Sequence, residues 1–203
     1  MVMGPDTARN AVPEEFDEID ALLEAAFDSR AEADLVRRLR QDGSMAWEMV
    51  TPWYDRHQRE RPIGAYAAIS RMVEPKNWFC LGPVAVWPKW QNGALALTED
   101  TVRADTLQQY FRFGSLLVGM VTMGFDDEAL IRRALGGAGL LDGPETPTLV
   151  VLGKPSFYAR AGFSLERAVR LISPYPISHT LIARAGDDVP ERVLVYPPAF
   201  ADL

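Results

Sequence analysis

Residues 148–163 read TLVVLGKPSFYARAGF, and this stretch predicts a buried strand that leads directly into a short helix. Thr148–Leu152 is a short apolar run rich in β-branched residues, which is typical of a strand buried on both faces. Gly153 ends that run, and Pro155 suits the first turn of a helix because its φ angle is fixed near the helical value. A helix that ends before Gly162 is too short to be stable alone, so packing must hold it in place.

The junction between this strand and helix is the first candidate for a functional site. Ligands of α/β sheets usually bind in the crevice at the carboxyl ends of the strands. Tyr158 lies on the predicted helix beside that crevice, and its phenol can both donate and accept a hydrogen bond. We therefore expect the chemistry of the protein at Tyr158.

Composition restricts the class of protein. The chain has 203 residues, of which 48% are hydrophobic and 24% charged, as expected of one soluble globular domain. Its net charge of −7 and its lack of a basic run argue against binding to nucleic acid or an anionic membrane. It has no secretory signal pattern and no apolar segment of the ~20 residues that cross a bilayer. We therefore expect a cytoplasmic protein. The chain has one cysteine, Cys80, so it cannot form an internal disulfide.

The chain before this stretch predicts two helices and then three strands. Apolar residues recur at helical spacing over about 14–27 and 29–40, and Gly43 ends the second helix. Three apolar segments separated by polar turns predict an antiparallel meander over residues 46–53, 63–73 and 78–87. Gly64 and Gly82 inside these strands indicate bulges or close backbone approaches.

A further helix is expected over 116–135, before the strand at Thr148–Leu152. Short strand-like pieces follow at about 165–172, 179–184 and 192–196. Helices and strands in this order fit a mixed sheet covered by helices, and they exclude an all-α or an all-β domain.

Several motifs occur in the order found in the Gcn5-related N-acetyltransferases (GNAT). The chain resembles this family at GPVAVWP, Gly82–Pro88, which corresponds to the central strand of the family. VVLGKPSFYARAGF, Val150–Phe163, is similar to strand five and its following helix. SPYP, Ser173–Pro176, and YPPAF, Tyr196–Phe200, resemble the closing segments. The resemblance covers most of the chain.

The resemblance implies an α/β GNAT-like fold, with a central twisted mixed sheet flanked by helices in one domain over residues 1–203. It implies acetyl-CoA as co-substrate and an amine of a small molecule or a protein as acceptor. In the family the central strand diverges from its neighbour and pairs with the pantetheine arm, a role that would fall to Val84, Ala85 and Val86. Tyr158 holds the position of the tyrosine that protonates the departing CoA thiolate.

The pyrophosphate loop of the family has two candidate positions in this chain. Its pattern, roughly Q-x-x-G-x-G/A, opens a helix whose N-terminal amides receive the phosphates. The favoured match is Gln109–Ser115, which precedes an apolar helix, and the competing match is Trp90–Ala94, which follows the central strand directly. In the favoured match, the residues expected to hold the cofactor are Arg112, Phe113, Gly114 and Ser115.

Two departures from the family pattern motivate an alternative function. Arg112 occupies a glycine position, although it could instead hold phosphate as a charged donor. An insertion at about 89–108 separates the central strand from the favoured loop, and it could form an arm that binds a partner. The alternative is a non-catalytic member of the fold that binds acyl-CoA or another ligand, or serves as an interaction module.

Other chemistry finds little support in the sequence. Glu74, Glu99 and Asp100 are available as a general base, but none belongs to a motif, so no base is assigned. Ser156 lacks the G-x-S-x-G pattern of a hydrolase. Two histidines and one cysteine give no metal-ligand spacing, so no metal is expected. The acceptor is not identified, and a homodimer remains open.

Overall fold

The computed structural model describes residues 4–5, 9–54, 62–88, 148–159, 163–184 and 186–202. The strands are β1 (Gly4–Pro5), β2 (Arg9–Asn10), β3 (Met45–Tyr54), β4 (Ile63–Arg71), β5 (Trp78–Val86), β6 (Thr148–Leu152) and β7 (Thr180–Ala183). The α-helices are α1 (Phe16–Phe27), α2 (Ala31–Gln41) and α5 (Pro155–Tyr158). Short 3-10 turns occur at η1 (Pro13–Glu15), η4 (Glu166–Ala168), η5 (Ile177–His179) and η6 (Pro198–Asp202).

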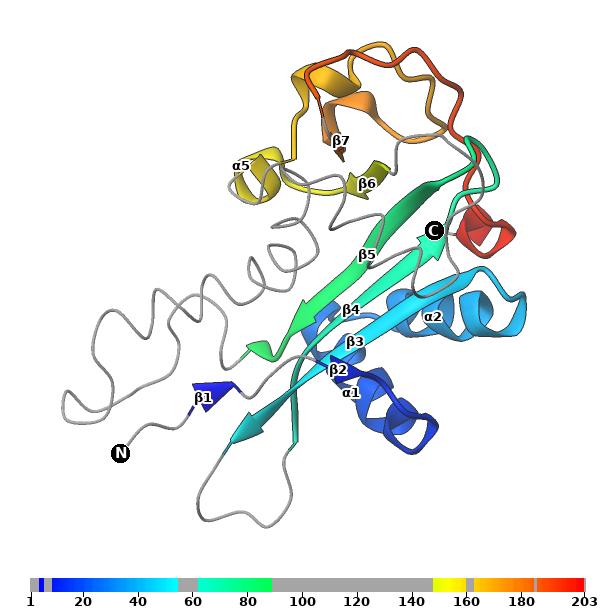
Figure 1. Ribbon diagram of the computed structural model, residues 1–203. Coiled ribbons are helices and arrows are strands. Elements are labelled where there is room, and N and C mark those ends of the chain that lie inside the picture. The colour runs from blue at the N-terminus through cyan, green and yellow to red at the C-terminus, as the bar shows by residue number, and fades with distance from the viewer. Residues whose placement is uncertain are drawn as a thin grey trace, which may run out of the picture.

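The strands form one mixed sheet in the order β1-β3-β4-β5-β6-β7, and β2 also pairs with β3. The β3, β4 and β5 strands run antiparallel to their neighbours in this meander, whereas β5 and β6 are parallel. Figure 1 shows the three long strands side by side, with β6 and β7 beyond the upper part of β5. The expected meander and the mixed sheet covered by helices are confirmed.

Both glycines expected at irregular positions lie at bulges. Gly64 is the extra residue between the pairs Thr51↔Ala65 and Pro52↔Ile63. Gly82 lies in the shift between Ala67↔Val84 and Ile69↔Leu81. A bulge adds a residue to one strand and bends it, so β5 changes direction near its middle.

The two faces of the sheet have different cores. On one face, Tyr66, Ala68 and Ala85 pack with Ile19 and Val36 of the two long helices. The opposite face carries a second cluster, which includes Ala65, Ala67, Ile69, Phe79, Leu81, Leu149 and Val151. Successive residues of β4 alternate between these clusters, as the period of two in a strand requires. In Figure 1, α1 and α2 lie together beside β3 and β4.

Several expectations concern the C-terminal part and the middle of the chain. The strand expected at 179–184 is confirmed as β7. The strand expected at 165–172 is wrong, because residues 166–168 form a 3-10 turn and only Ile172 makes a bridge. The piece at 192–196 forms single bridges at Val193 and Val195 rather than a full strand. The expected helix at 116–135 and insertion at 89–108 lie outside the described residues.

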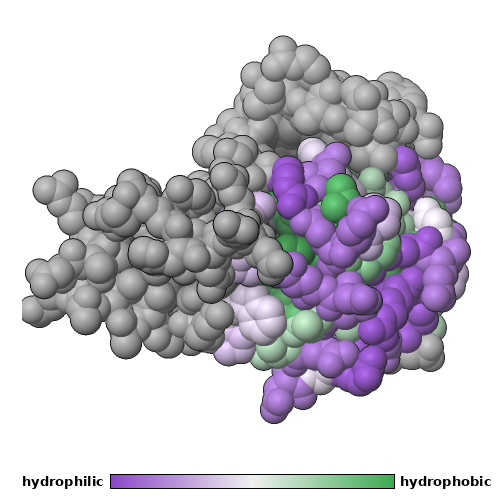
Figure 2. Space-filling model, turned by 90° about the horizontal axis from the view of Figure 1, so that it is seen from below, coloured by the Kyte–Doolittle hydropathy of each residue, from purple (hydrophilic) through white to green (hydrophobic). Residues whose placement is uncertain are grey.

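The surface over the described residues is mostly hydrophilic in the view from below, with small hydrophobic areas between the hydrophilic ones (Figure 2). Among the described residues, no helix has the length and apolar character needed to cross a membrane.

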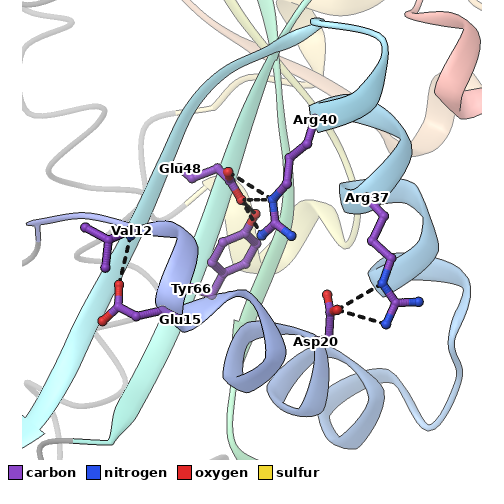
Figure 3. Close-up of polar contacts among 7 residues, drawn as sticks. All are labelled: Val12, Glu15, Asp20, Arg37, Arg40, Glu48 and Tyr66. Atoms are coloured by element: carbon purple, nitrogen blue, oxygen red, sulfur yellow. Dashed lines mark hydrogen bonds and ion pairs between the residues drawn. The ribbon is translucent and has the colours of Figure 1, made fainter.

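A largely buried ion pair joins α2 to the sheet (Figure 3). The Arg40 guanidinium donates to the Glu48 carboxylate, with Nη2 2.7 Å from Oε1, and the side chains are only 14% and 11% exposed. The Tyr66 hydroxyl donates to the same Oε1 at 2.6 Å. Burial, followed by the nearby Glu48 carboxylate, raises the pKa of Tyr66 well above its ordinary value, so this phenol stays protonated as a donor. The Phe16 ring lies 3.6 Å from the Arg40 guanidinium carbon.

We expect Arg40→Met to lower the free energy of unfolding by about 3 kcal/mol, because it leaves the largely buried Glu48 carboxylate without its cation. Arg9→Met is the matched control, since the Arg9 side chain in its pair with Glu15 is 45% exposed, against 14% for Arg40, and its loss should cost about 1 kcal/mol or less. Urea denaturation of both variants measures the difference. Equal losses in the two variants would contradict the assigned role of the buried pair.

Candidate active site

The pairing between β5 and β6 stops halfway along β5. It runs from Trp78↔Thr148 to Leu81↔Val151, and β6 ends one residue later at Leu152. The β5 strand continues to Val86 on its β4 side. The two parallel strands therefore share only their first halves, and the second half of β5 extends beyond the end of β6 (Figure 1).

The sequence of β5 explains why the pairing ends there. Leu81 makes the last pair with β6, and Gly82-Pro83 follows at the bulge opposite β4. Pro83 has no N–H to donate, so it cannot continue a hydrogen-bonded ladder. Gly82 has a φ of +154°, which a residue without a Cβ adopts more readily. The motif that identified the central strand thus also ends its pairing with β6.

The residues beyond the bulge alternate between the two faces of the sheet. Val84 and Val86 are half-buried and pack against the same cluster as Tyr158. Ala85 is buried and points to the opposite cluster, beneath the helices. The structure therefore brings the side chains of Val84, Val86 and Tyr158 to one face of the sheet, whereas the side chain of Ala85 lies on the opposite face.

The ring of Tyr158 is held against the end of β6. A Cβ added to Gly153 would lie 2.4 Å from Cε2 of Tyr158, so the ring rests directly on the Gly153 backbone. The Tyr158 ring also meets the Phe163 ring edge-to-face, with centroids 5.8 Å apart and planes at 76°. The Phe163 N–H donates to the Tyr158 carbonyl at 3.2 Å, and the Tyr158 N–H donates to the Lys154 carbonyl at 3.2 Å. The phenol therefore occupies a fixed position beside the point where β5 and β6 part.

Burial keeps this phenol protonated. It raises the pKa of Tyr158 from its ordinary value of 10.0 to about 12, and a smaller contribution comes from the Cys80 thiol. At neutral pH the hydroxyl consequently remains a proton donor. Cys80 itself is fully buried, and burial raises the pKa of its thiol to about 12, so it is an unreactive core residue.

Other candidate residues are placed less favourably or not described. Glu74 lies before the amino end of β5, whereas Tyr158 follows the carboxyl end of the parallel β6, so Glu74 is at the wrong end of the sheet to act as a base there. Lys154 is exposed at the start of α5. The residues of both pyrophosphate-loop candidates, Arg112, Phe113, Gly114, Ser115 and 90–94, lie outside the described residues, as do Glu99 and Asp100.

Two residues at the site carry a role that the sequence did not reveal. Gly153 was expected to end a strand, but it also provides the space that the Tyr158 ring occupies. Phe163 fixes the other side of that ring. The only sequence signal was their place within one motif.

Trp87 donates from Nε1 to the Ile63 carbonyl at 2.8 Å and packs among core residues. Within the described residues, no group of three or more acidic, histidine or cysteine side chains is arranged to hold a metal.

Comparison with known proteins identifies the family. The chain is 33% identical to the uncharacterized N-acetyltransferase YhbS of Escherichia coli K12 over 127 residues, which cover 62% of this chain and 70% of that protein. No family model matches the chain.

Solved structures of two GNAT proteins have the same fold. One is YhbS from Escherichia coli in complex with CoA, with a TM-score of 0.67 and 24% identity over 98% of this chain and 93% of that chain. The other is a GNAT family acetyltransferase from Brucella melitensis in complex with acetyl-CoA, with a TM-score of 0.61 and 22% identity over 96% and 97% of the chains. Because the chain is related to YhbS and its β5 strand diverges from β6, it belongs to the GNAT family of N-acetyltransferases.

Proposed function

We propose that this protein transfers the acetyl group of acetyl-CoA to an amine of a small molecule or a protein. The observation that carries the proposal is the end of the β5–β6 pairing beside a fixed, protonated phenol. Two further facts support it: the solved structure of the Escherichia coli relative contains CoA, and that of the Brucella melitensis protein contains acetyl-CoA.

The second half of β5 is suited to an extended ligand. Residues 82–86 continue past the last pair with β6, and five strand residues span roughly 17 Å. In this proposal the pantetheine arm lies along Val84, Ala85 and Val86, as an added strand would. The phosphates are assigned to Arg112, Phe113, Gly114 and Ser115 as a prediction, and the competing segment at 90–94 stays open.

The chemical step follows from these positions. The amine nitrogen attacks the thioester carbonyl carbon, and backbone amides of β5 near Val84 stabilise the negative charge that develops on the carbonyl oxygen. The carbon–sulfur bond breaks, and Tyr158 supplies its hydroxyl proton to the sulfur. The amine loses one proton to solvent or to a base that is not assigned, and a proton from solvent restores the Tyr158 hydroxyl, so an amide and free CoA thiol result.

A non-catalytic member of the fold is the second candidate, favoured by Arg112 at a glycine position and by the insertion at 89–108. Calorimetric titration with acetyl-CoA, followed by detection of CoA thiol release over a panel of primary amines, separates the two functions. Micromolar binding with amine-dependent thiol release supports the transferase. Binding without release for every amine, or no binding below the millimolar range, supports the alternative.

We expect Tyr158→Phe to lower kcat by about 100-fold or more while acetyl-CoA affinity changes by less than about twofold, because only the proton donor is removed. Steady-state kinetics with the best amine, together with calorimetry, measure both quantities. Tyr175→Phe is the control, since its hydroxyl donates to the Phe200 carbonyl in the C-terminal part of the chain. A kcat within about threefold of wild type would remove Tyr158 from the reaction.

The pH dependence should follow from the pKa of Tyr158, which burial raises to about 12. Because a raised pKa preserves the protonated form, the contribution of the phenol is complete at neutral pH and is lost only as the pH approaches 12. The ratio of wild-type to Tyr158→Phe kcat should therefore stay constant from about pH 7 to 10. A ratio that falls with a midpoint at or below the ordinary value of 10.0 would show that the phenol is not desolvated during turnover.

Gly153→Ala tests how the ring is positioned. The added Cβ must displace the Tyr158 ring, so we expect kcat to fall by about 10-fold or more. If the effect acts through the hydroxyl, Gly153→Ala should change kcat by less than about twofold in a Tyr158→Phe background. An equal loss in both backgrounds would show that the glycine serves the fold or the binding of substrate rather than the phenol. Thermal melts of each variant identify any loss of folding.

A further inference from the structure

Lysine is scarce in this chain. Of its 21 lysine and arginine residues, only three are lysines: Lys76, Lys89 and Lys154. Arginine stays protonated in proteins, so it does not offer the neutral nitrogen that attack on a thioester requires. The side-chain amines that can themselves accept an acetyl group are therefore few, and the position of each in the fold decides whether it can meet the thioester.

The two lysines that the structure describes lie at opposite ends of the sheet. Lys76 precedes β5, which begins at Trp78, whereas Lys154 follows β6, which ends at Leu152. Because β5 and β6 are parallel, Lys76 lies at the amino ends of both strands and Lys154 at the carboxyl end of β6. Lys89 lies outside the described residues. Of the two described lysines, only Lys154 is at the end of the sheet where β5 and β6 part.

The backbone of Lys154 is fixed next to the phenol. Its carbonyl accepts from the Tyr158 N–H at 3.2 Å. Its neighbour Gly153 is the residue on which the Tyr158 ring rests, and successive Cα atoms are only about 3.8 Å apart. The φ and ψ of Lys154 are −71° and 115°, so it has extended backbone and stands just before α5. Lys154 therefore joins the glycine under the ring to the helix that carries the ring.

The side chain of Lys154 is available for reaction. It is exposed, and among the described residues its ammonium group has no hydrogen-bond or ion-pair partner. Lys76 differs, because its Nζ donates to the Val73 carbonyl at 3.2 Å and lies 3.9 Å from a Glu74 carboxylate oxygen. Lysine carries its nitrogen on a flexible four-carbon chain. The Lys154 amine can therefore move over the surface around the Tyr158 ring.

We propose that Lys154 is a site of self-acetylation, where the chain transfers the acetyl group of its own bound acetyl-CoA when no other amine is present. This inference rests on the proposed acetyltransferase function. The neutral Lys154 amine attacks the thioester carbonyl carbon and loses one proton to solvent as the amide forms. The carbon–sulfur bond breaks, Tyr158 supplies a proton to the sulfur, and a proton from solvent restores the phenol. The products are Nε-acetylated Lys154 and CoA thiol.

Mass spectrometry of the protein incubated with acetyl-CoA in an amine-free buffer tests the proposal. Digestion with a protease that does not cleave at lysine gives the acetylated fraction of Lys154 and of Lys76 over time. We expect Lys154 to be acetylated at least about 10-fold faster than Lys76, because only Lys154 is positioned beside the phenol. In urea-unfolded chain the two rates should agree within about threefold, because the fold then positions neither amine. Equal rates in the folded chain would overturn the proposal.

A pair of variants separates enzymatic transfer from the spontaneous reaction of an exposed amine. Tyr158→Phe should lower the acetylation rate of Lys154 by about 10-fold or more and change that of Lys76 by less than about twofold, because only the transfer to Lys154 uses the phenol. Tyr175→Phe is the matched control and should change neither rate. An undiminished rate at Lys154 in Tyr158→Phe would show that the modification is spontaneous and would overturn the proposal.

The dependence on protein concentration tests whether the transfer occurs within one chain. Because Lys154 adjoins its own phenol, the first-order rate constant should be the same over a tenfold range of protein concentration. A rate constant that rises in proportion to the concentration would show transfer between copies and would reject this inference.

Failure of this inference can be distinguished from failure of the proposed function. CoA thiol release with added amines is measured on the same preparation. Acetylation of an added amine without a preference for Lys154 would reject the self-acetylation site and leave the transferase function standing. No binding of acetyl-CoA, together with equal slow rates at Lys154 and Lys76, would reject both.

Discussion

The site depends on one constraint: β6 can pair with β5 only as far as Leu81. Two parallel strands would normally continue their hydrogen bonds for as long as both chains remain extended. Here Pro83 lacks the N–H that the ladder needs, and the bulge around Gly82 bends β5 at the same point. The chain after Leu152 turns away into Gly153 and α5. The separation of β5 from β6 therefore begins at Gly82-Pro83, and the Tyr158 ring lies beside the end of β6.

The side chains of β5 alternate between the two faces of the sheet, so neighbouring residues of this strand have different surroundings. Ala85 is buried under the helices, while Val84 and Val86 are half-buried on the face of Tyr158. A change at Ala85 therefore acts on the packing of α1 and α2, whereas changes at its two neighbours act on the proposed cofactor surface. The Arg40–Glu48 pair belongs to the helical face as well. The ion pair and the proposed site thus lie on opposite faces of one sheet, although each face carries a buried core cluster.

Sequence patterns predicted the elements whose residues repeat regularly. The meander of β3, β4 and β5 followed from apolar segments separated by turns, and β6 from a five-residue apolar run. The expected strand at 165–172 was wrong for a local reason: the Ser164 hydroxyl accepts from the Arg167 N–H at 3.1 Å and favours a 3-10 turn. Arg167 then donates to the Arg184 carbonyl, a contact between distant parts of the chain. Contacts of this kind leave no periodic signal in the sequence.

The site was predictable only in part, for the same reason. The motif identified Tyr158, but the contact of its ring with Gly153 appears only when the short helix folds back over the end of β6. The family resemblance also assigned cofactor residues at 112–115, and those remain predictions because they lie outside the described residues. The sequence motif therefore located the phenol, whereas the orientation of its ring could be known only from the tertiary structure.

The raised pKa of Tyr158 places a condition on the chemistry. A phenol with a pKa of about 12 is a weaker acid than an ordinary thiol, whose pKa is about 8.5. Complete transfer of its proton to a free thiolate would be unfavourable by about 5 kcal/mol, at 1.36 kcal/mol for each unit of pKa. Charge develops on the sulfur as the carbon–sulfur bond breaks, and net proton transfer from the phenol is favourable only because the proton that the amine releases can restore the phenol. A neutral phenol held in a fixed position can stabilise that developing charge through a hydrogen bond throughout the step. Its rigid placement between Gly153 and Phe163 consequently matters as much as its acidity.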